Sequence, residues 1–128
     1  MNQDELNKIS GLVLDCSIEV HKQLGPGLLE SVYEICLYKE LRNRNLFVER
    51  QVVVPVVYKG ESLDIDFRTD LLVQKEVIVE LKSVEVLLPV HDAQLLTYLK
   101  LMDKKLGLLI NFNVPRLIDG FHRKVLNF

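Results

Sequence analysis

The chain has 128 residues, enough for one domain that buries about two-thirds of its unfolded surface. Apolar residues make up 48% of it and charged residues 27%, a composition that excludes a disordered chain. The net charge of −2 gives no overall basic character of the kind that marks nucleic-acid binding, although a basic groove can exist on an acidic protein.

The cysteines and the N-terminus indicate where the protein works. Cys16 and Cys36 are the only cysteines, and no CxxC motif is present. We expect free thiols in a reducing cytosol, and two cysteines cannot form a four-cysteine zinc or iron–sulfur site. The opening "MNQDELNKIS" is unlike a secretory leader, and no apolar run approaches the ~20 residues of a membrane span. The sequence therefore predicts a cytoplasmic protein with no membrane contact.

Two helices are expected in the first third of the chain. Apolar residues recur there at three- and four-residue steps, which predicts an amphipathic helix over about Asp4–Leu24. The "GPG" at Gly25–Gly27 ends it, and a second helix follows over about Leu28–Asn43. The expected core contacts of the second helix are Val32, Cys36 and Leu41.

Three strands are expected next. A β-branched run predicts a strand over Val48–Tyr58, in which Pro55 indicates a bulge or a place near a sheet edge. A turn at Lys59-Gly60 leads to a second strand over about Leu63–Val73 and a third over about Val77–Val84.

The last third of the chain returns to a helix and ends in strands. Pro89 fits a helix N-terminus, and "GLLINF" at Gly107–Phe112 reads as a short buried strand. Leu117–Phe128 predicts a final strand with a bulge at Gly120. The helix is expected to contact the core through Val90, Leu95, Leu99 and Met102. The order ααβββαββ predicts a single α/β (α+β) domain over residues 1–128, with a mixed sheet flanked by helices.

The hairpin between the second and third strands carries the candidate chemistry. If Gln74–Glu76 form a three-residue loop, alternation along the strands places Asp70 opposite Glu80. Lys82 then lies on the same face, while the opposite face is apolar except for one threonine. A two-residue loop would instead set Asp70 against Val79.

In the three-residue register the two acids have Cβ atoms ~5 Å apart and repel by roughly 3 kcal/mol at an effective dielectric of 20. Folding alone gives no reason for this, whereas a hard divalent cation prefers carboxylate oxygens. Lys82 could orient a water nucleophile or stabilise charge on a phosphate. The structural alternative is a solvated face on which Lys82 pairs with one of the acids.

Several motifs in order resemble a known family. Asp70 followed by "ELK" at Glu80–Lys82 resembles the core of the PD-(D/E)XK nuclease superfamily. "GLLESVY" has the spacing GxxExxY, "QLLTY" has the spacing QxxxY, and "GLLINF" and "IDGFHR" are similar to the GxxExxY protein family, a branch of that superfamily. The similarity runs from about Ile9 to Val125. One departure is Thr69, which replaces the first residue of the "PD" pair, a position that does not bind the metal.

The resemblance implies a restriction-endonuclease-like core and a divalent metal site that takes Mg²⁺ or Mn²⁺. It makes Asp70 and Glu80 the principal metal ligands and Lys82 the catalytic lysine that assists the attacking water. Glu30 matches a helix acid that helps to hold the metal, directly or through water. Read alone, Glu30 is an acid favoured early in a helix by the helix dipole.

Further support residues follow from the same resemblance. Gln94 and Tyr98 match a pair that supports the site or the substrate phosphate, and their i, i+4 spacing puts them on one helix face. His91 is one turn back on nearly the same face, and Tyr33 completes GxxExxY. Read alone, Gln94 and Tyr98 are ordinary helix-surface residues, Tyr33 a packing residue and His91 a solvent-exposed one.

Two function classes stay open. One is a Mg²⁺-dependent nuclease that hydrolyses phosphodiester bonds, with DNA as the expected substrate and RNA or a nucleotide as the alternative. The other is a non-catalytic module that binds nucleic acid or protein on the same fold. The intact set of two acids and a lysine favours the nuclease. Because one small domain offers little surface for gripping a duplex, a homodimer or a partner protein is expected.

Overall fold

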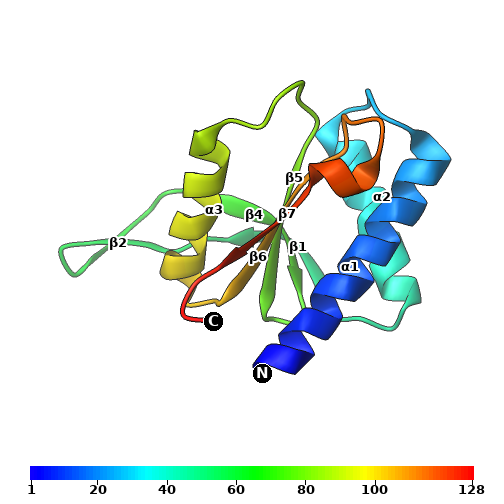
Figure 1. Ribbon diagram of the computed structural model, residues 1–128. Coiled ribbons are helices and arrows are strands. Elements are labelled where there is room, and N and C mark those ends of the chain that lie inside the picture. The colour runs from blue at the N-terminus through cyan, green and yellow to red at the C-terminus, as the bar shows by residue number, and fades with distance from the viewer.

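The computed structural model describes residues 1–128 as a five-stranded sheet with helices on both faces (Figure 1). Helices α1 (Gln3–Leu24) and α2 (Glu30–Asn43) cover one face, and α3 (Pro89–Met102) covers the other. The strands are β1 (Val48–Val53), β2 (Val56–Tyr58), β3 (Glu61–Leu63), β4 (Arg68–Val73), β5 (Val77–Lys82), β6 (Leu106–Asn111) and β7 (Phe121–Val125). The mixed sheet flanked by helices is therefore confirmed.

The main sheet has the strand order β1-β4-β5-β6-β7, while β2 and β3 form a separate two-stranded ribbon. Only the β5–β6 pair is parallel, and the other neighbours are antiparallel. A parallel pair needs a long crossover, and α3 supplies it between β5 and β6. This crossover puts α3 beside the end of β5, where the candidate acids lie.

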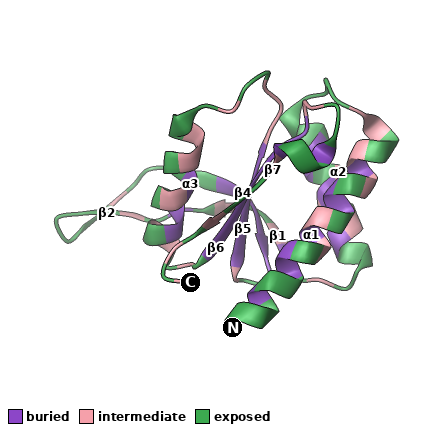
Figure 2. Ribbon diagram, in the orientation of Figure 1, coloured by how far each residue is buried: buried purple, intermediate pink, exposed green.

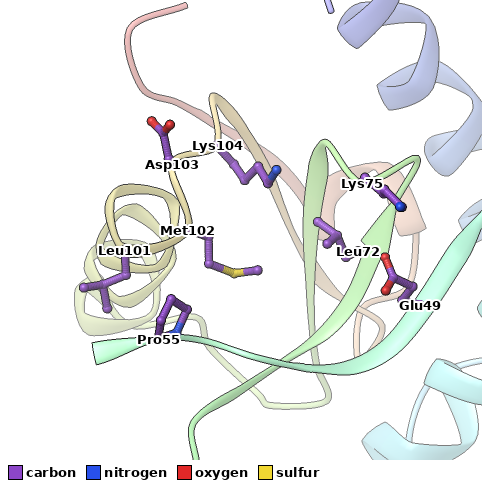
Figure 3. Close-up of a pocket in the computed structure, with 8 residues that line it drawn as sticks. All are labelled: Glu49, Pro55, Leu72, Lys75, Leu101, Met102, Asp103 and Lys104. Carbon is purple, nitrogen blue, oxygen red and sulfur yellow. The ribbon is translucent and has the colours of Figure 1, made fainter. Parts of the chain in front are cut away.

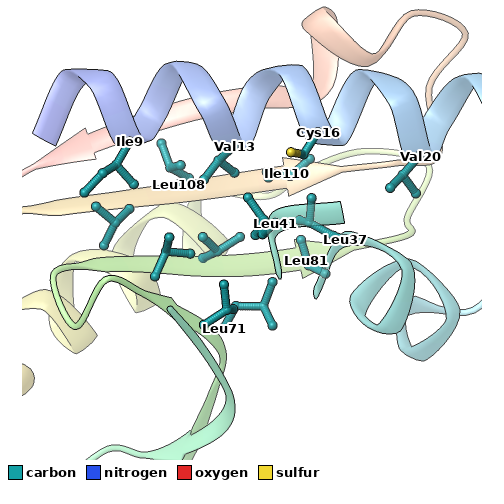
Figure 4. Packing of buried hydrophobic residues seen from close by; sticks show 14 of the residues in the cluster. Ile9, Val13, Cys16, Val20, Leu37, Leu41, Leu71, Leu81, Leu108 and Ile110 are labelled. Atoms are coloured by element: carbon teal, nitrogen blue, oxygen red, sulfur yellow. The ribbon is translucent and has the colours of Figure 1, made fainter. Parts of the chain in front are cut away.

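The larger core lies between the sheet and the helices α1 and α2. In Figure 4, Ile9, Val13, Cys16 and Val20 of α1 point at the strands. These residues form the stripe at three- and four-residue steps that the sequence predicts. Each large apolar side chain buried there stabilises the folded state by about 1.5–3 kcal/mol. Burial also raises the pKa of the Cys16 thiol, which makes it a poor nucleophile.

A smaller core lies on the opposite sheet face, under α3. It consists of Val54, Leu72, Ile78, Leu95, Tyr98, Leu99 and Leu109. The central strands are thus covered on both faces, and Figure 2 shows them almost wholly buried. Two-sided burial explains why β5 and β6 read as nearly continuous apolar runs.

The first predicted strand was too long, because the chain breaks at Pro55. Proline cannot donate to a ladder, so β1 stops at Val53 and the chain leaves the sheet as the β2–β3 arm, residues 55–66. The second predicted strand is divided in the same way, with β3 inside the arm and β4 beginning at Arg68. In Figure 1 the arm extends beyond α3.

Two predicted core residues are exposed instead. Val32 of α2 is 37% exposed and Val90 of α3 is 62% exposed. Helix α2 begins at Glu30, two residues later than predicted, and turns Tyr33, Leu37 and Leu41 inward at four-residue steps. Val90 occupies the first turn of α3, ahead of the part of the helix that contacts the sheet.

The C-terminal segment also differs from its prediction. A short 3-10 helix, η1 (Leu117–Gly120), precedes β7 where a continuous strand was expected. Gly120 packs against β6 rather than forming a bulge, because a Cβ there would lie 2.1 Å from the backbone oxygen of Asn111. None of the three helices combines the length and apolar character that crossing a bilayer requires.

Candidate active site between the ends of strands β4 and β5

The hairpin of β4 and β5 has the three-residue loop that the sequence predicts. Val73 pairs with Val77 and Leu71 pairs with Val79, so the alternative two-residue loop is excluded. Gln74 and Lys75 both adopt left-handed backbone angles, with φ of 54° and 58°, which closes the turn. This register carries Asp70 and Glu80 to the same level of the two strands.

The two strands separate just where the acids begin. The paired residues end at Leu71 and Val79, and the Asp70 carboxylate, not a strand carbonyl, accepts the Leu81 N–H at 2.8 Å. The opening also changes Thr69, which was expected on the apolar face. Its side chain is buried, and its hydroxyl donates to Glu80 Oε1 at 2.6 Å across the gap where the pairing of β4 with β5 has ended.

Glu80 is the more buried of the two acids, with only 6% of its surface exposed. Its pKa is raised from 4.5 to about 8, chiefly by burial and next by the nearby charge of Asp70. The Thr69 hydroxyl and the Lys82 ammonium oppose this rise without cancelling it. At neutral pH the carboxyl group therefore holds a proton in the absence of a cation.

Asp70 shows the same imbalance. Burial is the largest cause that raises its pKa, and the charge of Glu30 raises it further. The Leu81 N–H and Lys82 act in the opposite direction. Glu30, an exposed acid on the first turn of α2, is thus near enough for its charge to act on Asp70.

Lys82 ends β5 and forms no salt bridge. The three salt bridges of the structure join Arg50 to Glu34, Arg68 to Asp66, and Lys124 to Asp92. The expectation that Lys82 simply pairs with an acid is thus not met, although its charge acts on both carboxyl groups. Its backbone is fixed, since the Lys82 carbonyl accepts the Phe112 N–H at 3.0 Å.

The loop before α2 is fastened beside the end of β5. The Ser83 hydroxyl donates to the Leu28 carbonyl at 2.6 Å, which ties the residue after Lys82 to the segment before Glu30. The Tyr33 hydroxyl donates to the Gly25 carbonyl at 2.6 Å and accepts the Leu28 N–H at 3.1 Å. Tyr33 thus braces the loop that leads to Glu30.

Helix α3 brings one of its three candidate residues to the acids. Tyr98 is 8% exposed, and its pKa is raised by burial and by the charges of Glu80 and Asp70. Gln94, one turn earlier, is exposed. His91 caps the helix, since its Nδ1 accepts the Leu88 N–H at 3.0 Å.

The sequence reasoning missed two residues that contact the site. Gln51 of β1 donates through Nε2 to Glu34 Oε1 at 2.6 Å and approaches Asp70 Oδ1 at 3.4 Å. Glu34 is buried in α2 and also accepts from Arg50 at 3.1 Å. The one available hint was the acid at Glu34 on the inward face of α2, which needs a buried partner.

The donor set suits a hard cation with few protein ligands. No group of three or more His, Cys, Asp or Glu side chains is arranged to hold a metal, so Glu30 does not join Asp70 and Glu80 in one cluster. Mg²⁺ is commonly bound by one or two carboxylates, with waters and substrate phosphates completing its shell. Two neighbouring carboxylates, Glu80 buried and Asp70 half-buried, fit that role.

The largest hollow of the structure lies elsewhere. It has a volume of about 470 Å³ and lies between the C-terminal end of α3 and the sheet (Figure 3). Leu72 and Lys75 line it, as do Met102 and Lys104, and neither acid of the candidate site reaches it. Neither Asp70 nor Glu80 lines any of the other hollows of the structure.

Comparison with known proteins agrees with this geometry. A family model described as the PD-(D/E)XK nuclease superfamily matches residues 7–124, nearly the whole chain. The chain therefore belongs to the PD-(D/E)XK nuclease superfamily, and its fold is restriction-endonuclease-like. Searches of curated proteins and of solved structures found no match. Membership supports a nuclease-type function, a nucleic-acid substrate and the use of a divalent metal.

Proposed function

We propose that this chain is a Mg²⁺-dependent nuclease that hydrolyses phosphodiester bonds of DNA, with Mn²⁺ as an alternative metal. The observation that carries the proposal is the pairing of Asp70 and Glu80 where the strands separate. Burial raises both pKa values, the charge of Asp70 adds to the rise at Glu80 and that of Glu30 to the rise at Asp70, and Lys82 has no salt bridge. Such an arrangement destabilises the folded protein when no cation is bound and stabilises it when a cation is bound.

The protein groups have distinct roles in this proposal. Asp70 and Glu80 would hold the metal, and Glu30 at the start of α2 would help to hold it, directly or through water. A bound Mg²⁺ polarises the scissile phosphate and acidifies a water. Lys82 orients the attacking water. It also stabilises the negative charge on the phosphate, which is larger in the transition state than in the bound substrate. Tyr98 limits solvent access to the acids from the side of α3.

Finer assignments rest on the same residues. We place the chain in the GxxExxY branch, because Gly27, Glu30 and Tyr33 have its spacing and Tyr33 braces the loop that leads to Glu30. The free thiols Cys16 and Cys36 support a cytoplasmic location. A homodimer or a partner protein would add the surface that a duplex needs.

The metal site is tested by calorimetric titration of the protein with Mn²⁺. We expect wild type to bind one ion at the acids and Asp70→Asn to weaken binding by at least tenfold, because the variant loses one of two charged ligands. Asp66→Asn, an exposed acid paired with Arg68, is the matched control and should bind as wild type does. Equal affinities for wild type and Asp70→Asn would remove Asp70 from the site.

The nuclease is distinguished from a binding module by Lys82→Ala. If Lys82 acts mainly in the transition state, the variant should lose ~10²–10³-fold in turnover while its DNA affinity changes little. Cleavage and binding of one labelled DNA should be measured at a single salt concentration, because affinity that rests on phosphate contacts falls with salt. Lys100→Ala, an exposed lysine of α3, is the control.

Suppose that wild type binds DNA, cuts nothing with Mg²⁺ or Mn²⁺, and behaves as Lys82→Ala does. The protein is then a non-catalytic binding module and not a nuclease. Testing cleavage of RNA beside DNA distinguishes an inactive protein from one that acts on RNA instead.

A further inference from the structure

The backbone of β1 has an irregularity beside the acids. Gln51 adopts φ of 54°, a left-handed conformation that is strained for any residue but glycine. The residues on both sides keep one register with β4, since Arg50 pairs with Leu71 and Val52 pairs with Thr69. The irregularity is therefore confined to one residue, and it is the residue level with Asp70.

The irregularity changes where side chains point. Consecutive residues of a strand face opposite sides of the sheet. Yet Arg50 and Gln51 both donate to the same carboxylate, that of Glu34. The left-handed angle at Gln51 makes this possible, because it breaks the alternation at a single position and lets Val52 pack under α3.

Glu34 is held in a fixed position by these contacts. Its side chain is 8% exposed, and each of its carboxylate oxygens is occupied. Arg50 donates to Oε2 at 3.1 Å, and the Gln51 amide donates to Oε1 at 2.6 Å. Glu34 lies one turn after Glu30 on α2, so this contact also fixes the helix that carries Glu30.

The Gln51 amide lies between two carboxylates. One is Glu34, and the other is Asp70, whose Oδ1 lies 3.4 Å from Gln51 Nε2. Because both neighbours only accept hydrogen bonds, the NH₂ group of the amide must face them. The opposite oxygen of Asp70 accepts the Leu81 N–H, so the carboxylate is confined from two sides.

From this arrangement we infer that Gln51 is a positioning residue for the metal-binding carboxylate of Asp70, and that Glu34 holds Gln51 in place. The inference rests on the proposed function, which makes Asp70 a ligand. A neutral amide suits this position, because it orients a carboxylate without the positive charge that would compete with a cation. Groups that orient ligands in this way typically contribute 10–100-fold to metal affinity.

The test compares Gln51→Ala with Gln51→Gly. Both variants lose the amide, but glycine adopts φ of 54° without strain, so Gln51→Gly should melt a few degrees above Gln51→Ala. Both should weaken Mn²⁺ binding about tenfold or more in calorimetry at 25 °C, well below unfolding. A purely structural role would instead make affinity follow melting temperature. Gln23→Ala, an exposed glutamine of α1, is the control.

A second readout needs no metal. The Leu81 N–H donates to Asp70, so its hydrogen exchange reports whether that carboxylate stays in place. We expect exchange at Leu81 to accelerate about tenfold in both Gln51 variants, while the amide of Val79 in the paired part of β5 is unchanged. Wild-type exchange at Leu81 in the variants would overturn the inference, whether or not Mn²⁺ affinity falls.

The role of Glu34 is tested by a double-mutant cycle. Glu34→Gln should weaken Mn²⁺ binding, and adding Gln51→Ala should weaken it little further. Both changes interrupt the same series of contacts, from Glu34 through Gln51 to Asp70. Fully additive losses would overturn the link from Glu34 to Asp70. If wild type binds no Mn²⁺, the nuclease proposal fails. Hydrogen exchange at the Leu81 amide, measured in Glu34→Gln and in the Gln51 variants, still decides whether these residues hold Asp70 in place.

Discussion

At the scale of single residues, the protonation of Asp70 and Glu80 decides what the empty site does. Burial is the largest cause of the raised pKa of each, and the charge of Asp70 raises the pKa of Glu80 further. Two carboxyl groups coupled in this way lose their protons as a pair. The site without a cation is therefore most stable when it retains a proton, and it becomes less stable as both groups ionise.

The first residue-scale prediction concerns stability against pH without metal. The pKa of Glu80 is raised from 4.5 to about 8, so between these values the folded state binds more protons than the unfolded state. Stability should then fall as pH rises from about 4.5 to 8, by an amount on the order of 5 kcal/mol, and this loss should level off above pH 8.

Glu80→Gln removes the titrating group and keeps an oxygen that can accept from Thr69. Chemical denaturation at several pH values should show a flatter profile for this variant and a higher stability than wild type at pH 8. Glu85→Gln, an exposed acid in the loop after β5, is the matched control. Identical profiles for wild type and Glu80→Gln would contradict the assigned cause.

The residues of the site differ in how far the sequence could predict them. Alternation and a loop length place Asp70 and Glu80 together, because both rules are local and the hairpin obeys them. Thr69 and Gln51 reach the acids only because the ladder opens and one residue of β1 is left-handed. Those two departures depend on tertiary contacts, so no periodic pattern contains them.

At the scale of elements, helices and strands were predictable and their ends were less so. Helix α1 begins one residue before its predicted start and ends where predicted, because Asn2 caps it and Gly25 follows it. The strand around Pro55 was too long, because β propensity continues past the residue that ends the ladder. Propensity describes the interior of an element, whereas caps and proline determine its limits.

Two glycines provide an element-scale prediction. At Gly120 a Cβ would lie 2.1 Å from the Asn111 carbonyl oxygen, and a backbone atom cannot rotate away as a side chain can. Gly120→Ala should therefore lose on the order of 2–3 kcal/mol by forcing η1 away from β6. At Gly11, inside α1, no heavy atom lies within 4 Å of the added Cβ.

Gly11→Ala should accordingly gain about 0.5–1 kcal/mol from helix propensity and from the lower entropy of the unfolded chain. Urea denaturation of the two variants measures both effects. A loss of similar size at both positions would show that the packing of η1 on β6 is not the cause.

At the scale of the whole molecule, the sheet separates two cores and the site lies at one end of it. The core under α1 and α2 contains 19 buried residues, and the core under α3 contains seven. Both layers adjoin the acids, because Gln51, held by Glu34 of α2, reaches Asp70, and the charges of both acids act on Tyr98 of α3. The stability of the site therefore depends on both cores.

The β2–β3 arm belongs to neither core, which leads to a prediction about the minimal fold. None of residues 55–66 is among the buried members of either cluster. The Val54 N–H donates to the Phe67 carbonyl at 2.8 Å, so the chain already closes a hairpin at the base of the arm. An Asn-Gly pair can join those two residues in a two-residue turn of the kind that antiparallel strands prefer.

We therefore expect replacement of residues 55–66 by Asn-Gly to leave cooperative unfolding intact and to shift the melting temperature by only a few degrees. The shorter connection costs less closure entropy, which offsets the lost ribbon contacts. Mn²⁺ affinity should be that of the full chain, since both acids remain paired behind the same β1–β4 ladder. The matched control is Lys59→Asn, which puts the same Asn-Gly pair at the tip of an intact arm. Non-cooperative melting of the shortened chain, with the control unchanged, would mean that the arm is part of the fold and not an appendage to it.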